Sequence, residues 1–182
     1  MKEEQGAEYY DKAYTERPQY GLNVDSEHSW HSDLYAFVLT LLNKEEMIVE
    51  LGCGSGQFAE TLLKNGYNYA WGVDFSVVAI EMCIQRTKKQ WFEVGDLYKI
   101  NMDFENDTYL CLETMEHIYW DLTVLAKIPK GKRIVFSVPN FDDFAHVRFF
   151  SNKEEVENHY GYLFTNFTVH TVNRYFVIDA RV

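Results

Sequence analysis

The chain has 182 residues, a length typical of one domain. Hydrophobic residues make up 47% and charged residues 25%, which is the composition of a folded globular protein and excludes a disordered one. With 28 acidic against 17 basic residues, the formal net charge of −11 disfavours a protein whose main partner is a nucleic-acid backbone. No apolar run reaches the roughly 20 residues of a membrane helix, and residues 1–5 are too polar for a signal peptide. We therefore expect a cytoplasmic protein with no membrane partner.

The three cysteines, Cys53, Cys83 and Cys111, lie far apart in the sequence and form no C-x-x-C pair. Neither a disulfide framework nor a zinc site is indicated. Because their neighbours are apolar residues or glycines, we expect all three to be buried, reduced thiols.

Residues 1–46 differ in pattern from the rest of the chain. They are polar and aromatic up to about Trp30, and apolar residues then recur at helical spacing. We expect an N-terminal cap that ends in one amphipathic helix. Its apolar face would be formed by Leu34, Val38, Leu41 and Leu42.

From residue 47 onward, short apolar runs alternate with amphipathic segments. The apolar runs predict buried strands at 47–51, 69–73, 91–94, 109–112 and 133–138. Between them, the spacing predicts helices at 57–65, from a cap at Ser76 to Ile84, and at 122–128. Ser151 and Glu154 form a capping-box signal for one more helix, which ends near Gly161.

The tail, residues 164–182, is rich in Thr, Val, Phe and Tyr and predicts two further strands. They lie too close for a crossover helix, so one of them is expected to be antiparallel. The predicted fold is α/β: a Rossmann-like, doubly wound sheet of about seven strands, mostly parallel with one antiparallel strand near the C-terminus, and helices on both faces. We expect a single domain over 1–182, with the cap at 1–46 and the core at 47–182.

A glycine-rich turn follows the first predicted strand. Gly52, Gly54 and Gly56 alternate with other residues and lead into a helix, so the backbone can turn sharply and approach a ligand. The helix start behind them presents unpaired N–H groups to an anionic group. The spacing is G-x-G-x-G, and the bulky Phe58 stands where a dinucleotide fold needs small residues, which argues against a nicotinamide dehydrogenase.

Two aspartates follow the next two strands. Asp74 ends the second strand, where an acid is placed to bind both hydroxyls of a ribose. Asp96 and Leu97 end the third strand, where a carboxylate beside an apolar residue can meet an adenine. The three elements in this order indicate a nucleoside-bearing ligand at the switch point of the sheet.

These motifs, together with Glu113-x-x-Glu116-His117, resemble those of the class I S-adenosylmethionine-dependent methyltransferases. The resemblance covers roughly residues 45–140. Within the class it is greatest to the small-molecule branch that includes the ubiquinone-biosynthesis O-methyltransferases. Ser137-Val138-Pro139-Asn140 and the segment from His146 to Phe150 also resemble that branch.

The resemblance implies S-adenosyl-L-methionine as the cofactor and S-adenosyl-L-homocysteine as the product. It further implies a role for each cofactor-binding residue. Glu50, Gly52, Gly54 and Gly56 would hold the methionine part, Asp74 the ribose, Phe75, Asp96 and Leu97 the adenine, and Glu113 would lie along the methionine side. The cap would cover the cofactor and shape the acceptor pocket, with Tyr9, Tyr10, His28, Trp30 and His31 as candidates.

Glu116 and His117 allow three interpretations. They can simply begin a helix, since an acid in a first turn is favoured by the helix dipole. Alternatively, His117 is the general base for a phenol or alcohol acceptor, with His146 as the second candidate. The third is a divalent metal site: we predict no metal, and Glu113, Glu116 and His117 are the candidate ligands if one binds.

The metal interpretation comes with an alternative function. RNA 3′-terminal 2′-O-methyltransferases resemble the E-x-x-E-H signature and use a magnesium or manganese site, as do some quinone O-methyltransferases. The RNA enzymes supply a further histidine downstream, which His146 could be. Arg148, the one cation in an aromatic run, is expected to form a structural ion pair.

The sequence thus predicts a methyltransferase (EC 2.1.1.-) that acts on a small-molecule acceptor at an oxygen atom. The alternatives are the metal-dependent RNA enzyme and a non-catalytic S-adenosylmethionine-binding subunit. The sequence does not fix the acceptor or the oligomeric state.

Overall fold

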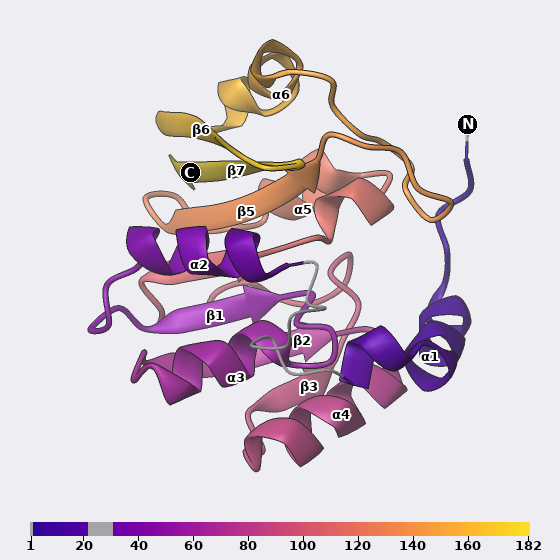
Figure 1. The fold of residues 1–182 in the computed structure, drawn as a ribbon. Coiled ribbons are helices and arrows are strands. Elements are labelled where there is room, and N and C mark those ends of the chain that lie inside the picture. Colours follow the sequence, from indigo (N-terminus) through magenta and orange to yellow (C-terminus); the bar gives the residue numbers. More distant parts are fainter. Residues whose placement is uncertain (1, 22–30) are drawn as a thin grey trace.

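The computed structural model describes residues 2–21 and 31–182, and its centre is a seven-stranded sheet with the order β3-β2-β1-β4-β5-β7-β6 (Figure 1). The strands are β1 (Ile48–Leu51), β2 (Tyr69–Asp74), β3 (Phe92–Val94), β4 (Thr108–Cys111), β5 (Arg133–Pro139), β6 (Asn166–Val172) and β7 (Tyr175–Arg181). Strands β1 to β5 pair in parallel, and β7 runs antiparallel to both β5 and β6. The predicted sheet, with its one antiparallel strand, is confirmed.

Six α-helices and three short 3₁₀ segments complete the described part of the chain. The helices are α1 (Ala7–Glu16), α2 (Ser32–Leu41), α3 (Gln57–Lys64), α4 (Val77–Thr87), α5 (Asp121–Leu125) and α6 (Lys153–Tyr160). The 3₁₀ segments are η1 (Pro18–Gly21), η2 (Met115–His117) and η3 (Gly161–Leu163).

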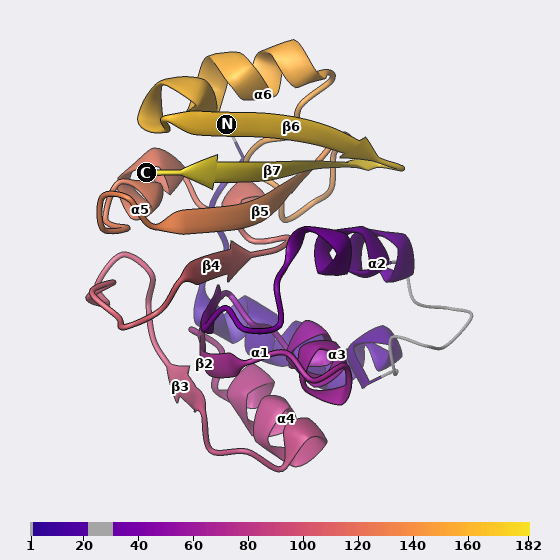
Figure 2. The ribbon, with the colours of Figure 1, turned by 90° about the vertical axis from the view of Figure 1, so that its left-hand side faces the viewer.

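Alternation of side chains along the strands divides the core into two layers. On β5, Ile134 and Phe136 point to the layer that α5 and α6 cover, whereas Val135 points to the layer covered by α2, α3 and α4. Figure 2 shows these helices on opposite sides of the sheet. Because the central strands are buried on both faces, they read in the sequence as continuous apolar runs.

Two local expectations needed correction. The helix expected at 122–128 is only Asp121–Leu125. The capping box is shifted by one residue: Asn152 caps α6 by accepting from the Glu155 N–H at 2.9 Å, and the Glu155 carboxylate accepts from the Ser151 N–H. An asparagine cap fits this position as well as serine does, so the pattern alone did not fix the register.

The N-terminal segment contains a helix that the periodicity did not predict. Besides α2, it forms α1, in which Ala13 is the buried residue. Figure 1 shows α1 beyond the arrowhead of β1, at the carboxyl end of the parallel strands. Its position comes from tertiary contacts. The Asp11 carboxylate, for example, accepts hydrogen bonds from the Ser76 hydroxyl and the Val78 N–H at the start of α4.

The described helices include none that could span a membrane. Within the described residues, no helix has the length and apolar character to cross a bilayer. A cytoplasmic location and the division into a cap at 1–46 and a core at 47–182 are not tested by this finding. The three cysteines are buried and unpaired by disulfides, as expected.

We predict that Phe136→Ala lowers the free energy of unfolding by about 3–5 kcal/mol. Phe136 is fully buried in β5 and its ring lies edge-on to that of Tyr160, with 5.1 Å between centroids, so truncation leaves a cavity in the α6 layer. Chemical denaturation would measure the loss. Tyr162→Ala, at a residue that is 70% exposed, is the control and should change stability by less than about 0.5 kcal/mol. Equal effects of the two substitutions would contradict the packing described here.

Candidate active site

A cavity of about 420 Å³ opens at the carboxyl ends of β1, β2 and β4, beneath α1. Every predicted catalytic and cofactor-binding residue except Gly56 lines it: His117, His146, Glu50, Gly52, Gly54, Asp74, Phe75, Asp96, Leu97 and Glu113. Residues from four strand ends therefore share one cavity. This is the place at which an open α/β sheet binds its ligands.

The glycine loop lies tightly against its neighbours. The N–H groups of Gly52 and Cys53 both donate to the Val73 carbonyl at the end of β2, at 2.8 and 2.9 Å. Gly52 has φ +72°, and a Cβ there would lie 2.3 Å from the Thr114 hydroxyl oxygen. Gly54, with φ +52°, faces the Tyr14 hydroxyl across the cavity. Only glycine leaves this wall open to a ligand.

Gly56 has a different position. It precedes the first residue of α3 with φ +75°, and a Cβ there would lie 2.9 Å from the Cys83 sulfur. Its role in the structure is the close approach of α3 to α4, away from the cavity lining.

Asp74 connects the two strands at the floor of the cavity. Its carboxylate accepts from the Gly54 N–H at 3.0 Å and from the Ser76 N–H at 2.9 Å. Burial raises the pKa of Asp74 to about 6. Asp96 lines the same cavity, and one of its oxygens accepts from the Tyr98 N–H. Two carboxylates that accept hydrogen bonds fit the hydroxyl and amino groups of a nucleoside, so the residues present suit the cofactor that the resemblance implies.

Two glutamates close the inner end of the cavity. Glu50 is 3% exposed and accepts from the Tyr69 hydroxyl at 2.9 Å, and burial raises its pKa to about 8. Glu113 has an unusual φ of +52° for a non-glycine residue. This backbone turns its carboxylate toward the Ser137 hydroxyl, which donates to it at 2.8 Å, and burial raises its pKa to about 8 as well. Both acids therefore hold a proton at neutral pH unless a ligand compensates their charge.

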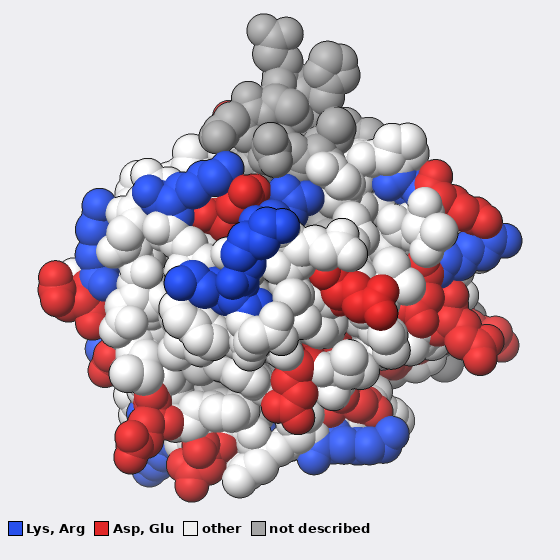
Figure 3. All heavy atoms as spheres, turned by 90° about the horizontal axis from the view of Figure 1, so that it is seen from below, with Lys and Arg blue, Asp and Glu red and all other residues white. Residues whose placement is uncertain are grey.

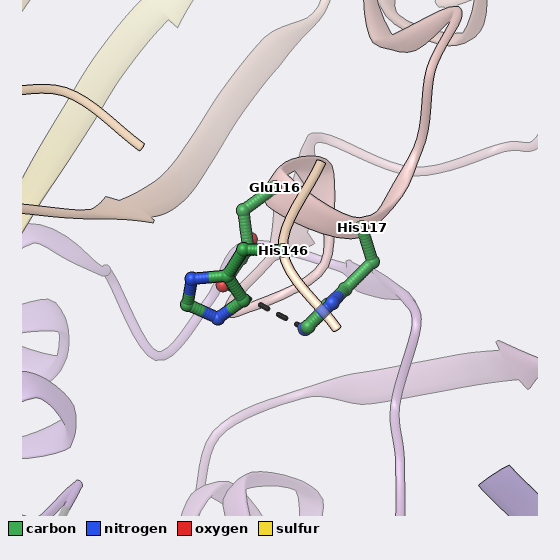
Figure 4. Close-up of side chains that lie close together, drawn as sticks. All are labelled: Glu116, His117 and His146. Atoms are coloured by element: carbon green, nitrogen blue, oxygen red, sulfur yellow. Dashed lines mark ion pairs between the residues drawn. The ribbon is translucent and has the colours of Figure 1, made fainter. Parts of the chain in front are cut away.

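Glu116, His117 and His146 converge beside this end (Figure 4). One atom of each lies within 4.8 Å of the others, and the His117 Nε2 is 4.0 Å from a Glu116 oxygen. Glu116 is fully buried, and neither of its carboxylate oxygens has a hydrogen-bond partner among the described residues. Burial raises the pKa of Glu116 well above its ordinary value. An unpartnered buried carboxyl is costly, so this side chain is poised for a ligand.

The Nδ1 atom of each histidine lies beside a backbone carbonyl. The His117 Nδ1 lies 3.0 Å from the Ala145 carbonyl, and the His146 Nδ1 lies 3.2 Å from the Phe141 carbonyl. A carbonyl only accepts, so each Nδ1 carries the proton and each Nε2 has a free lone pair. Burial lowers the pKa of His117 to about 4, so its ring is neutral at pH 7. Such a histidine is a weak general base but a good metal ligand.

The three residues, called the Glu116 cluster below, include two of the three metal candidates that the sequence suggested, together with His146, which was considered as the further histidine of the RNA enzymes. Glu113 is held by Ser137 and is not a member. Two imidazoles whose Nδ1–H groups are oriented by carbonyls, with one buried carboxylate, form a donor set that fits Zn²⁺, Mn²⁺ or Fe²⁺ better than Mg²⁺, which prefers oxygen ligands.

The cap covers the cavity with aromatic side chains. Tyr10 packs on Phe75, with 5.2 Å between ring centroids, and edge-on to His117 at 5.6 Å. Its hydroxyl is buried and has no hydrogen-bond partner among the described residues. Tyr9 and His31 also line the cavity, whereas His28 and Trp30 lie outside the described residues.

Sequence reasoning missed several lining residues: Tyr14, Tyr20, Tyr35, Phe141, Arg174 and Tyr175. Five of the six are aromatic, and no spacing rule separates an aromatic residue of the cavity from one of the core. Only the high aromatic content of 16% indicated an aromatic cavity.

A comparison with protein families matches the centre of this site. The profile of the family described as "Methyltransferase domain" matches residues 48–130, which include the glycine loop, Asp74, Asp96 and the Glu116 turn. The matched residues are similar to a methyltransferase domain. The match supports the predicted class I S-adenosylmethionine-dependent methyltransferase and its cofactor, whereas the ubiquinone-biosynthesis branch stays a prediction. No curated protein sequence matches the chain.

Solved structures show the same fold at low sequence identity. A methyltransferase from Thermotoga maritima, described as a possible histamine N-methyltransferase, is 17% identical, with 96% of this chain and 95% of that chain covered and a TM-score of 0.67. Magnesium protoporphyrin IX methyltransferase from Synechocystis with bound S-adenosylmethionine is 12% identical, with 96% of each chain covered and a TM-score of 0.67. A Haloferax volcanii methyltransferase in complex with the Trm112 activator is 13% identical, covers 94% and 96%, and has a TM-score of 0.73. At these identities the likeness establishes the fold.

We predict that Glu50→Gln changes the pH dependence of stability in the ligand-free protein. The folded wild type keeps the Glu50 proton up to about pH 8, whereas the unfolded chain releases it near pH 4.5, so the free energy of unfolding of the wild type falls as pH rises between these values. The variant lacks this loss. Its stability relative to the wild type should therefore grow with pH, by at most about 1.4 kcal/mol per pH unit.

Chemical denaturation of both proteins at several pH values between 5 and 8 would measure the difference. Glu93→Gln, at an exposed residue of β3, is the matched control and should show a constant difference from the wild type. A pH-independent difference for Glu50→Gln would contradict the burial of an uncompensated carboxyl.

Proposed function

We propose that this methyltransferase acts on a small-molecule acceptor and transfers the methyl group to an oxygen atom. One observation carries the proposal: the aspartates that suit a nucleoside and the histidines of the Glu116 cluster line one cavity beneath an aromatic cap. A volume of about 420 Å³ is in the range of small-molecule sites. Two of the structural relatives are described by small-molecule acceptors, histamine and magnesium protoporphyrin IX, which is in line with this class.

The chain's own residues supply binding, orientation and proton acceptance. The cofactor, held by Asp74, Asp96 and the glycine loop, supplies an electrophilic methyl group with a neutral thioether as leaving group. The cavity walls hold the acceptor oxygen in line, and such positioning lowers the barrier by several kcal/mol, up to about 10. His117, with its free Nε2, accepts the hydrogen of an acceptor hydroxyl, and Tyr10 excludes water above it.

We also propose that the Glu116 cluster binds a divalent cation. A cation there would occupy the lone pair of the His117 Nε2, so His117 would then be a ligand and not the base. The cation would instead lower the pKa of an acceptor hydroxyl, whose proton would pass to solvent. The donor set supports this: the carboxylate of Glu116 has no other partner, and two neutral imidazoles face it. The expectation of no metal stays untested, and the proposed ligand set keeps Glu116 and His117 but replaces Glu113 by His146.

The metal-dependent RNA enzyme is the weaker alternative. The Glu116 cluster favours its metal requirement, but the net charge of −11 opposes RNA binding. The basic residues around the α5–β5 turn are engaged locally: Lys127 donates to the Leu97 carbonyl, Lys132 to the Asn106 carbonyl, and Arg133 pairs with Glu46 and Asp179. On the face shown in Figure 3, Lys and Arg side chains are interspersed with Asp and Glu.

We predict that the purified protein binds S-adenosylhomocysteine with micromolar affinity and that Asp74→Ala weakens binding about 10- to 100-fold, the effect of one or two lost hydrogen bonds to a charged group. Isothermal titration calorimetry would measure it. Asp107→Ala is the control, because Asp107 accepts from the Met47 N–H at the opposite end of β1. To distinguish the small-molecule enzyme from the RNA enzyme, the protein is then incubated with labelled S-adenosylmethionine and either a small-molecule extract or RNA, and transfer of the label is measured. Label in RNA alone, or no binding by the wild type, would refute the proposal.

We predict that Mn²⁺ or Zn²⁺ binds the Glu116 cluster and that His146→Ala lowers the affinity at least about tenfold. Since the pKa of Glu116 is raised, binding should release a proton at neutral pH, which titrations in buffers of different ionisation enthalpy would detect. His170→Ala, at a histidine on β6 outside the cluster, is the control. Equal affinities of the two variants, or no binding at all, would rule the site out.

A further inference from the structure

Arg148 lies just after the loop that carries His146, and its guanidinium reaches into the turn that carries Glu116 and His117. It donates to the carbonyls of Met115 and Ile118 through Nη1 and to the Tyr119 carbonyl through Nη2, at 2.8 Å in the last case. The side chain is 16% exposed. One planar guanidinium thus satisfies three carbonyls of one turn through a fixed fork of donors, a geometry that an ammonium does not reproduce.

The main chain beside Arg148 holds the same turn. The N–H groups of Val147 and Arg148 donate to the Glu116 carbonyl at 2.8 and 3.3 Å. The Ala145 carbonyl in turn accepts from the His117 ring. Residues 145–148 and 115–119 are therefore linked across their whole length, and each linked segment carries one histidine of the Glu116 cluster.

Asp121 anchors Arg148 to the rest of the fold. An Asp121 carboxylate oxygen lies 3.0 Å from Arg148 Nη1, and it also lies 3.0 Å from the His159 Nε2 and accepts from the Tyr160 hydroxyl at 2.8 Å. Asp121 is 1% exposed. The last two partners belong to α6, so the ion pair fixes the turn against a helix that covers the same layer of the core as α5.

We infer that Arg148 is a positioning residue for the proposed reaction: it fixes the spacing between His117 and His146 by holding their two segments together, without lining the cavity itself. The inference rests on the proposed function, because that function gives the two histidines their task. The ring centroids lie 5.0 Å apart, close enough for both Nε2 atoms to act on one group. A displacement of about 1 Å between such groups can lower a rate about 100-fold.

The test compares Arg148→Met and Arg148→Lys with Arg133→Met. Arg133 is a fair control, because its side chain is 14% exposed and ion-paired to Glu46 and Asp179, far from the cavity lining. Four measurements are made on each protein: the unfolding midpoint, the affinity for S-adenosylhomocysteine, methyl transfer from labelled S-adenosylmethionine to a small-molecule extract, and the ¹⁵N NMR signals of the histidine rings. These signals report which ring nitrogen of His117 and His146 carries the proton.

For Arg148→Met we expect that the Nδ1-protonated tautomer of both histidines is no longer the single form observed. Methyl transfer should fall about 100-fold. The affinity for S-adenosylhomocysteine should stay within twofold of the wild type. Arg148→Lys keeps the charge opposite Asp121 but satisfies fewer carbonyls, so its values should lie between. Arg133→Met should lower the unfolding midpoint yet keep the histidine signals and the turnover.

Unchanged histidine signals in both folded Arg148 variants would overturn the inference, as would a change of the same size in Arg133→Met. If Arg148→Met does not fold, Arg148→Lys decides by the same signals. Failure of the wild type to bind S-adenosylhomocysteine would instead refute the proposed function, and the histidine signals would still decide whether Arg148 positions the two rings.

Discussion

The site depends on how the ends of β1 and β2 are joined. The Val73 carbonyl accepts two N–H groups of the glycine loop, and the Asp74 carboxylate accepts a third from Gly54. These bonds hold the loop open in a left-handed backbone that only glycine adopts without strain. A side chain at Gly52 would meet Thr114 and one at Gly54 would meet the Tyr14 hydroxyl, so the loop also needs glycine for space.

Much of the fold and half of the site follow from local rules. Parallel strands buried on both faces read as unbroken apolar runs, and each acid that follows such a run lies at the same edge of the sheet, so Asp74 and Asp96 were predictable cavity residues. The Glu116 cluster was not predictable as a set. In the sequence, Glu113 and Glu116 are equally good candidates for a metal ligand. They are distinguished only by the structure, in which Glu113 has a positive φ and accepts a hydrogen bond from Ser137. Helix α1 was not predicted because its sequence has no helical repeat of apolar residues. Contacts with other elements hold it in place instead.

Buried carboxyls give this cavity its chemical character. Glu50, Glu113 and Glu116 are all held in their protonated form by desolvation when no ligand is present. A positively charged sulfonium and a divalent cation are two groups that would reverse this. The cavity therefore favours cationic occupants, and the formal net charge of −11 of the chain is consistent with that preference.

Helix α1 touches both ends of the cavity at once. Asp11 binds the start of α4 on the nucleoside side, while Tyr10 in the preceding position meets Phe75 and the His117 ring. If α1 has to shift for one ligand to bind, the shift is already made when the second ligand arrives. The second ligand then binds without the free-energy cost of that shift. Thermodynamic linkage makes such an effect equal in both directions: the acceptor must strengthen cofactor binding by the same factor by which the cofactor strengthens acceptor binding.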